Sequence, residues 1–459
     1  MNALSLGRCP RRVDFVEVDA PAQPGYARCE IGRHIVFDTR HLESYLFAKP
    51  SPMVHDALLV AAAVEFCDRL QVRPAGSWRR DFELLVPVYE IDKWRGPVVL
   101  KQLVETLNFL TGDRWDIHFR RRKGSPAVSA QDDFEFPPSR RAVMPFSDGL
   151  DSWAVATLED AKVKGLMRVR LGTAPAPKVR KGKSQPFQHV PYRVGFEGYR
   201  AAESSARSRG FKFALIGGIA AYLADVSDII MPESGQSIIG SELIVSPDVE
   251  PDYRSHPRFT DKMELLIQAL FGYSVNYLFP RIWSTKGETV RAAIAIDPIN
   301  DAWTKTRTCW QNQRRVALKG ERASCGICAA CLLRRVSLHH AEGGDRSLSP
   351  YVWNDLGAPT LESGAHPDFP KWKAAGKAFR KHAVAGTFFL ATLAQWDSEH
   401  ELPIKLAESA RFVSDATGIC PDACETGMRS LVRQHTVEWG AFLDTLGPHS
   451  FIANWARLL

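Results

Sequence analysis

Four cysteines within 23 residues place the strongest constraint on how this chain can fold. Cys325, Cys328 and Cys331 follow CxxCxxC spacing, and Cys309 lies 16 residues upstream. Four thiolates at such spacing can close a tetrahedral zinc site that leaves no open position for catalysis. An iron–sulfur cluster is the alternative interpretation of CxxCxxC, and we favour zinc over it. The sequence therefore predicts a structural zinc site at these four positions.

Composition favours a metal site over disulfides for these cysteines. The chain has 459 residues, of which 45% are hydrophobic and nine are cysteine. Its first 15 residues lack the continuous apolar stretch of a signal peptide, and no apolar run reaches membrane-spanning length. We therefore expect a cytoplasmic protein, not bound to membranes, with reduced cysteines. The formal net charge of +7 suits anionic ligands, but direct nucleic-acid binding is not expected from so low a charge.

The length favours two or three domains. Residues 1–140 alternate short strand-like runs with turns around an apolar helical segment at 54–70, which predicts an N-terminal α+β accessory domain. Residues 141–340 show the strand–helix alternation of a doubly wound parallel α/β sheet. Residues 341–459 carry long helical patterns, so we expect a C-terminal helical region with a structural or partner-binding role. The charged, Ser- and Pro-rich segment 120–141 is the candidate linker.

The stretch MPFSDGLDSWAV, residues 144–155, predicts a buried strand that leads directly into a helix. Exposed N–H groups and the helix dipole at such a helix start form an anion site, to which serines add donors and Gly149 a close backbone approach. Asp151 is expected at a magnesium ion and not in the core. An ordinary N-capped helix explains the same residues without a ligand. The predicted nucleotide-binding residues are Ser147, Asp148, Gly149, Leu150 and Ser152.

Three further stretches offer side chains for a second substrate. Glu233 follows a predicted strand, at the carboxyl edge where open α/β sheets bind ligands; it suits the N–H edge of a guanine-like base, and a solvated loop carboxylate is an equal alternative. Arg254 and His256 suit a substrate carboxylate or phosphates. Lys286 is the candidate to stabilise charge on a breaking phosphate bridge, with a surface salt bridge as the alternative. The basic loop 178–183 could close over ATP or contact a partner, and a solvated loop is the default interpretation.

Two of these motifs resemble those of a known family. SDGLDS resembles the SGGxDS loop of the PP-loop ATP pyrophosphatases, with Asp148 where that pattern has glycine. SCGICAACLLRR closely matches the late CGxCxxCxLR zinc knot of the 7-cyano-7-deazaguanine synthases, the QueC-like family. The resemblance covers about 145–340 and implies a PP-loop, HUP-like α/β fold. The additional N-terminal and C-terminal regions resemble the larger relatives of anti-phage defence operons, the QatC-like and type IV CBASS proteins.

The resemblance implies a C–N bond-forming ligase. It would adenylate the carboxylate of 7-carboxy-7-deazaguanine with ATP, and an amine would then form the amide, with release of pyrophosphate and AMP. In the biosynthetic family that amine is ammonia, and a second ATP converts the amide to a nitrile. The first alternative is conjugation of the deazaguanine to an amine of a partner protein from the same defence operon. The second is an inactive nucleotide-binding scaffold, to which Asp148 and Pro145 lend weight, since Pro145 removes a hydrogen-bond donor from a strand expected to be central.

This resemblance also assigns cofactors and roles. The implied cofactors are ATP, Mg²⁺ and Zn²⁺. The catalytic assignments are Asp151 and Lys286, and the substrate-binding assignments are Glu233, Arg254 and His256.

Overall fold

The computed structural model describes most of the chain in two compact units. The described residues are 10–45, 51–73, 79–124, 141–162, 164–172, 187–203, 207–244, 252–299, 301–309, 311, 316–346, 348, 350–396 and 402–458. Most of the predicted linker, residues 125–140, and the basic loop 178–183 lie outside them. Unit 1 is Met1–Phe146, Lys164–Met231 and Asp252–Leu278, and unit 2 is Ser147–Val163, Pro232–Pro251 and Phe279–Leu459.

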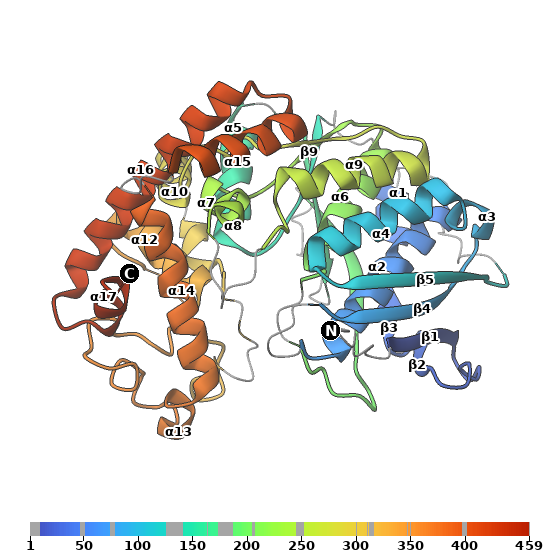
Figure 1. The fold of residues 1–459 in the computed structure, drawn as a ribbon, viewed down its shortest axis with the longest axis horizontal. Coiled ribbons are helices and arrows are strands. Elements are labelled where there is room, and N and C mark those ends of the chain that lie inside the picture. Colours follow the sequence, from blue (N-terminus) through green and yellow to red (C-terminus); the bar gives the residue numbers. More distant parts are fainter. Residues whose placement is uncertain are drawn as a thin grey trace, which may run out of the picture. The chain divides into compact units, whose positions relative to one another are not determined.

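Unit 1 is built on a ten-stranded sheet (Figure 1). In spatial order its strands are β10 (Asn276–Leu278), β9 (Asp228–Ile230), β6 (Ala142–Pro145), β7 (Leu166–Gly172), β8 (Phe187–Val194), β3 (Ile35–Phe37), β2 (Ala27–Ile31), β1 (Arg11–Glu17), β4 (Asp81–Val88) and β5 (Arg114–Arg121). Among the pairs of described strands, β3 with β8 is the antiparallel one, and the others are parallel. The predicted α/β fold with a mostly parallel sheet is confirmed.

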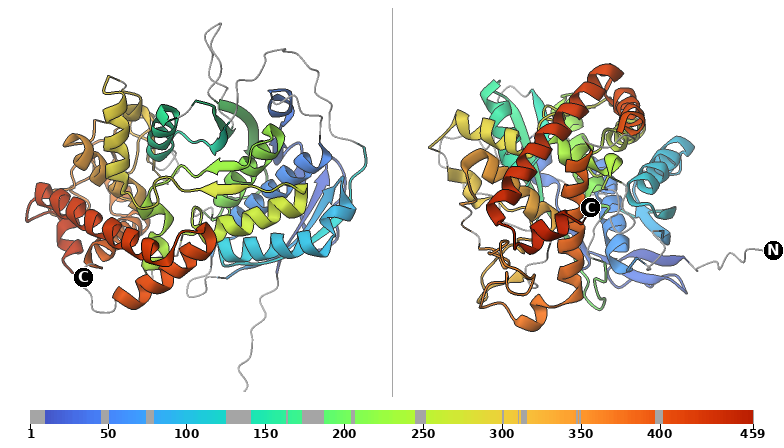
Figure 2. Two further views of the ribbon diagram at one scale, coloured as in Figure 1. Left: turned by 90° about the horizontal axis from the view of Figure 1, so that it is seen from above. Right: turned by 60° about the vertical axis from the view of Figure 1, so that its left-hand side comes forward.

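Four helices of unit 1 pack against the sheet and against one another: α2 (Pro52–Leu70), α4 (Pro97–Thr111), α6 (Arg209–Ala224) and α9 (Pro257–Phe271). Helix α2, predicted from its apolar spacing, begins where the Ser51 hydroxyl accepts the Val54 N–H. Figure 2 shows α4 and α9 side by side, in cyan and yellow-green. Short helices α1 (Arg40–Tyr45) and α3 (Ile91–Trp94) complete the unit.

Strand β6 leads into the predicted phosphate turn. Its last residue, Pro145, pairs with Val169 of β7. Proline has no N–H to donate, and the next ladder bond comes from Phe146, whose N–H donates to the Val169 carbonyl at 2.7 Å. On α6, a Cβ at Gly217 would meet Pro145 Cγ at 3.0 Å. Pro145 therefore ends the strand and packs closely against the helix.

Unit 2 is mainly helical. Its elements are α5 (Leu150–Lys162), α7 (Gly235–Ile238), α8 (Gly240–Leu243), α10 (Lys286–Ile296), the 3₁₀ helix η1 (Asp301–Lys305), α12 (Ala329–Glu342), α13 (Lys371–Ala374), α14 (Lys377–Gln395), α15 (Leu402–Thr417), α16 (Pro421–Leu446) and α17 (Phe451–Ala456). Helix α10 packs against both α5 and α12, and α16 packs against α12, α14 and α15. None of the helices in the described part of the chain has the length and apolar character needed to cross a bilayer.

Candidate active site and metal centre

The predicted phosphate turn folds back on its own serines. The Ser147 and Ser152 hydroxyls are 2.8 Å apart, and the Ser152 hydroxyl also accepts the Ser147 N–H at 3.2 Å. The Ser147 hydroxyl accepts the Gly149 N–H at 3.2 Å. Helix α5 begins at Leu150, so the first N–H groups of a 13-residue helix point out of this turn. A turn of this kind, with unbonded N–H groups at a helix start, can bind an anion.

Asp148, the departure from the family pattern, causes no backbone strain. Positive φ among the described non-glycine residues is confined to Asp19, Asp225 and Lys319. The Asp148 side chain is exposed, and its carbonyl accepts the Arg307 N–H at 2.8 Å. This turn therefore does not need glycine at position 148 for its backbone angles.

Asp151 and Lys286, predicted as catalytic, form a buried ion pair. Lys286 Nζ bonds Asp151 Oδ2, and the two side chains are only 4% and 11% exposed. Asp151 Oδ1 accepts the Ser234 hydroxyl at 3.3 Å. The expectation that Asp151 lies outside the core is therefore wrong, and so is the surface salt bridge considered for Lys286. Both side chains are instead buried in unit 2, where each is the charged partner of the other.

Lys286 is the first residue of α10, and a capping box holds it there. The Thr285 hydroxyl accepts the Glu288 N–H at 3.0 Å, and the Glu288 carboxylate accepts the Thr285 N–H at 2.8 Å. The Thr-x-x-Glu spacing in STKGE is a sequence signal for this helix start. The Lys286 N–H donates to Gln236 Oε1 at 2.8 Å. Hydrogen bonds therefore hold the backbone of Lys286 as well as its side chain.

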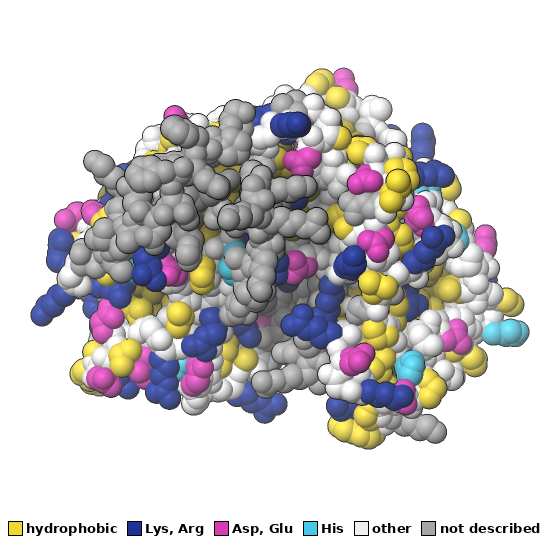
Figure 3. Space-filling model, turned by 180° about the vertical axis from the view of Figure 1, so that it is seen from behind, with side chains coloured by type: hydrophobic (Ala, Val, Ile, Leu, Met, Phe, Trp, Pro, Cys, Tyr) yellow, Lys and Arg dark blue, Asp and Glu magenta, His cyan; other side chains and the backbone are white. Residues whose placement is uncertain are grey.

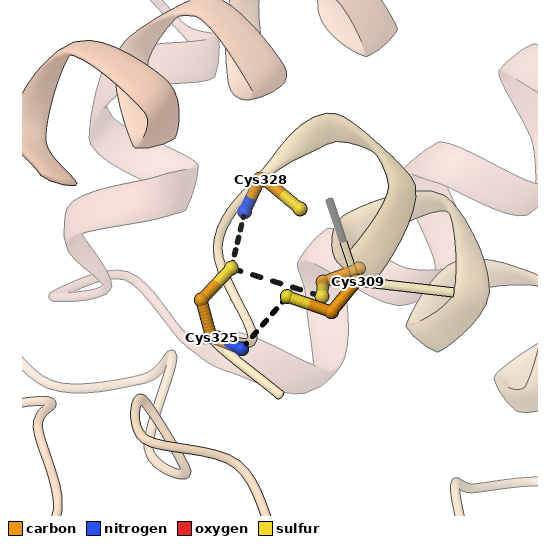
Figure 4. Close-up of side chains that lie close together, drawn as sticks. Cys309, Cys325 and Cys328 are labelled. Carbon is orange, nitrogen blue, oxygen red and sulfur yellow. Dashed lines mark hydrogen bonds between the residues drawn. The ribbon is translucent and has the colours of Figure 1, made fainter. Parts of the chain in front are cut away.

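The four predicted cysteines come together in unit 2, and Figure 4 shows three of them, Cys309, Cys325 and Cys328. Their sulfur atoms all lie within 4.8 Å of one another. Cys328 is the N-cap of α12 and Cys331 lies in its first turn, while Cys309 follows η1. The Cys325 N–H points at Cys309 Sγ (3.2 Å), and the Cys328 N–H points at Cys325 Sγ (3.3 Å). Four converging thiols with N–H···S bonds fit a structural zinc ion.

A glycine makes the bend between the first two cysteines of CxxCxxC possible. Gly326 has φ +88°, and a Cβ there would meet the Trp353 carbonyl oxygen at 2.6 Å. That carbonyl accepts a hydrogen bond from Arg335 of α12, whose guanidinium lies 4.0 Å from the Tyr351 ring. The glycine of the CGxCxxCxLR pattern, and the arginine that directly follows the pattern, therefore serve the packing around the cysteines.

Arg307, which the sequence did not single out, connects the turn to the cysteine cluster. Its N–H donates to the Asp148 carbonyl at 2.8 Å, and its guanidinium donates to the Ala323 carbonyl at 2.9 Å. It stands two residues before Cys309, and Ala323 stands two residues before Cys325. The folded state of the cluster is thus coupled to the backbone of the phosphate turn.

The predicted substrate residues fall in different units. Glu233 is half-buried in unit 2, immediately before Ser234. Arg254 and His256 belong to unit 1, where Arg254 pairs with Asp252 and His256 caps α9 by accepting the Arg258 N–H at 3.2 Å. The contacts within either unit do not bring the three together, so their assignment to one substrate remains a prediction.

Figure 3 shows one face of the molecule in space-filling form. On the described part of this face, Lys and Arg side chains lie among Asp and Glu side chains. The mixed charge agrees with the modest net charge of +7.

Comparison with known proteins identifies one part of the chain. Residues 239–342 match the family model described as "Queuosine biosynthesis protein QueC". The matched segment includes Lys286 and the four clustered cysteines, and the phosphate turn lies upstream of it. No curated protein matches the chain. Within residues 239–342 the chain is therefore similar to the QueC family.

Proposed function

We propose that this protein is an ATP-dependent ligase that adenylates the carboxylate of a 7-deazaguanine, 7-carboxy-7-deazaguanine being the substrate implied by the family. The observation that carries the proposal is the buried Asp151–Lys286 pair beside a serine turn at the start of α5. The QueC match adds support, because it contains Lys286 and the cysteine cluster. A positively charged side chain next to an anion-binding turn suits cleavage of a phosphate bridge.

In the proposed reaction, a substrate carboxylate oxygen bonds to the α-phosphorus of ATP, and the α–β bridging P–O bond breaks to release pyrophosphate. The turn at Ser147–Ser152 would bind the phosphates through backbone and hydroxyl groups, and Lys286 would stabilise the charge on the leaving oxygen. A neutral amine then bonds to the carbonyl carbon, loses a proton, and AMP leaves with the former carboxylate oxygen. The protein's contribution is positioning and charge stabilisation.

Magnesium would neutralise phosphate charge when bound, and Asp151 would hold it. Apart from the cysteine cluster, the described residues contain no group of three or more side chains placed as metal ligands. One carboxylate fits, because Mg²⁺ commonly takes one or two carboxylates and completes its shell with phosphate oxygens and water. Asp148, exposed in the same turn, is a second carboxylate within the same short segment.

The amine remains the part of the proposal with two outcomes. Ammonia would give the amide of the biosynthetic reaction, whereas an amine of a partner protein would give a conjugate. The proposed anti-phage defence context and its partner protein rest on the resemblance of the N-terminal and C-terminal regions to defence-type relatives. Intact-mass analysis of co-expressed neighbouring proteins separates the two, because conjugation adds one deazaguanine acyl group to the partner.

ATP–pyrophosphate exchange tests the adenylation step. Exchange that depends on 7-carboxy-7-deazaguanine is expected for the zinc-loaded protein and should be lost in Asp151→Asn and Lys286→Met. Lys305→Met is the matched control, because Lys305 is an exposed lysine of the same unit that pairs with Asp301 at 3.2 Å. Absence of exchange in the unaltered, zinc-loaded protein would refute the proposal.

A further inference from the structure

Helix α16, which lies outside the QueC-matched residues, reaches the backbone of Lys286 from two sides. Two of its buried polar residues, His435 and Glu438, are one helical turn apart and are 0% and 1% exposed. Each connects to Lys286 through one intermediate residue. All of these residues belong to unit 2.

The first connection is a directed chain of hydrogen bonds. The Leu390 carbonyl can only accept, so the His435 Nε2 that lies 2.9 Å from it carries the proton. His435 Nδ1 is then an acceptor, and Gln236 Nε2 lies 3.4 Å from it. This contact orients the Gln236 amide so that its Oε1 accepts the Lys286 N–H at 2.8 Å. Burial lowers the pKa of His435 to about 4, which keeps the ring neutral in this arrangement.

The second connection runs through the helix cap. The Thr285 hydroxyl donates to Glu438 Oε1 while it accepts the Glu288 N–H of the capping box. Gln434 Nε2 donates to the same carboxylate oxygen at 3.1 Å. A Cβ at Gly287 would lie 2.6 Å from Glu438 Oε2, so only glycine leaves room for the carboxylate against the first turn of α10. Glu438 thereby selects the Thr285 rotamer that caps α10.

We propose that α16 fixes the position of Lys286 for phosphate chemistry, with His435 and Glu438 as positioning residues. The two hydrogen-bonded connections hold the Lys286 backbone on both sides, one through Gln236 and the other through Thr285. The ion pair with Asp151 then has only to orient the Lys286 side chain. The catalytic consequence rests on the proposed function, whereas the positioning itself is a property of the folded chain. C-terminal residues far from the matched segment thus complete the proposed site.

Hydrogen exchange at the α10 start tests the positioning without any turnover. Glu438→Ala and His435→Ala should both speed amide exchange at residues 285–289, because the first turn opens more often without its supports. Glu438→Gln should restore protection, since its carbonyl oxygen can still accept the Thr285 hydroxyl. Met428→Ala is the matched control, because Met428 is a fully buried residue of α16 in the apolar cluster with Leu431. It should leave exchange at 285–289 unchanged.

Kinetics test the catalytic consequence. Glu438→Ala and His435→Ala should lower kcat for pyrophosphate exchange, on the order of 100-fold for a displacement near 1 Å, with little change in KM for ATP. Met428→Ala should keep kcat, and Glu438→Gln should recover most of it. Unchanged exchange at 285–289 in both alanine variants, or equal changes in Met428→Ala, would overturn the inference. If α10 responds as expected but the unaltered protein shows no pyrophosphate exchange, the positioning stands and the proposed function falls.

Discussion

The four-cysteine cluster and the Asp151–Lys286 pair are both buried in unit 2, but they compensate for burial in different ways. The pair brings opposite charges together, so its geometry is complete within the chain. The cluster gathers four groups of one kind. Hydrogen bonds from the other three thiols lower the pKa of Cys309, whereas burial raises the pKa of Cys325 well above its usual range. A cation is needed before all four can be thiolates, so only the cluster depends on a ligand for its stability.

Removing a ligand from the cluster should have the largest effect. Cys328→Ser is expected to leave the protein insoluble or melting far earlier, because structural zinc sites contribute on the order of 10 kcal/mol of apparent binding energy to folding. Elemental analysis should find roughly one zinc per chain. Cys420→Ser, at an exposed cysteine of the same unit, is the control and should melt like the parent. Iron with visible absorbance, or soluble metal-free protein with an unchanged melting temperature, would contradict this prediction.

Breaking the ion pair should come next. Asp151→Ala leaves the Lys286 charge buried without its partner, which costs about 3–5 kcal/mol of unfolding free energy. Asp151→Ala combined with Lys286→Met should regain most of that stability while ATP turnover stays lost, because no buried charge remains. Denaturant titration measures both.

The control for the ion pair is an exposed pair of the same unit. Glu362→Ala removes the partner of Arg380, which lies 2.8 Å away with 52% of its side chain exposed. Such pairs contribute about 0–1 kcal/mol. If Asp151→Ala and Glu362→Ala cost equally little, the buried pair does not exist in solution.

Burial shifts the pKa values of two α16 residues, His435 and Glu438, in opposite directions, so both should make stability depend on pH. Burial raises the pKa of Glu438 to about 7, so its stabilising contribution is full below about pH 4.5 and is lost as pH rises through 7. The lowered pKa of His435, about 4, acts oppositely, because stability is lost as pH falls from 6.5 towards 4. Each shift corresponds to about 3 kcal/mol.

Glu438→Gln should therefore remove one of the two opposing dependences of stability on pH. We expect the variant's unfolding free energy to exceed that of the parent above pH 7 and to rise with pH between 4.5 and 7. Glu288, Arg291 and His340, which face Glu438 from α10 and α12, are kept in both proteins. Denaturant titrations across this range provide the measurement, and parallel pH profiles would show that Glu438 titrates normally.

The smallest effect is expected at Asp148. Its side chain is exposed and its φ is ordinary, so Asp148→Gly should change stability by less than about 0.5 kcal/mol. ATP affinity should stay close to that of the parent. A higher magnesium requirement for half-maximal activity would indicate that Asp148 shares the ion with Asp151. A large gain in ATP affinity would instead favour an inactive scaffold.

The difference between the two regions also explains what could be predicted from sequence. Cys325, Cys328 and Cys331 lie within seven residues of chain, so the convergence of these three follows from local geometry. The serine turn is equally local, since strand, turn and helix are contiguous. The Asp151–Lys286 pair joins residues 135 positions apart, and no local pattern indicates which distant lysine meets a given aspartate. The buried position of Glu438 is even harder to predict from sequence, because a glutamate on an amphipathic helix usually faces water.

Prediction of the sheet from sequence meets the same limit, because local patterns do not indicate contacts between distant segments. The alternation of strand-like and helical segments predicts a mostly parallel sheet, because parallel neighbours need a crossover connection, usually a helix. The antiparallel pairing of β3 with β8 joins residues 155 to 159 positions apart, such as Val36 with Arg193, through only three residue pairs. Such a short contact between distant segments has no signature in hydrophobic spacing.

That short pairing also affects how the protein can be shortened. The outer strands of the described sheet are β10 and β5, and β3 shields one side of β8. A truncated protein that starts at Ala142 would leave the backbone N–H and C=O groups of Tyr192–Val194, which pair with β3, open to strands of neighbouring molecules. Pairing with β3 of the N-terminal segment thus protects β8 from self-association with other molecules. Gel filtration of the truncated protein should show oligomers where the full chain stays dispersed.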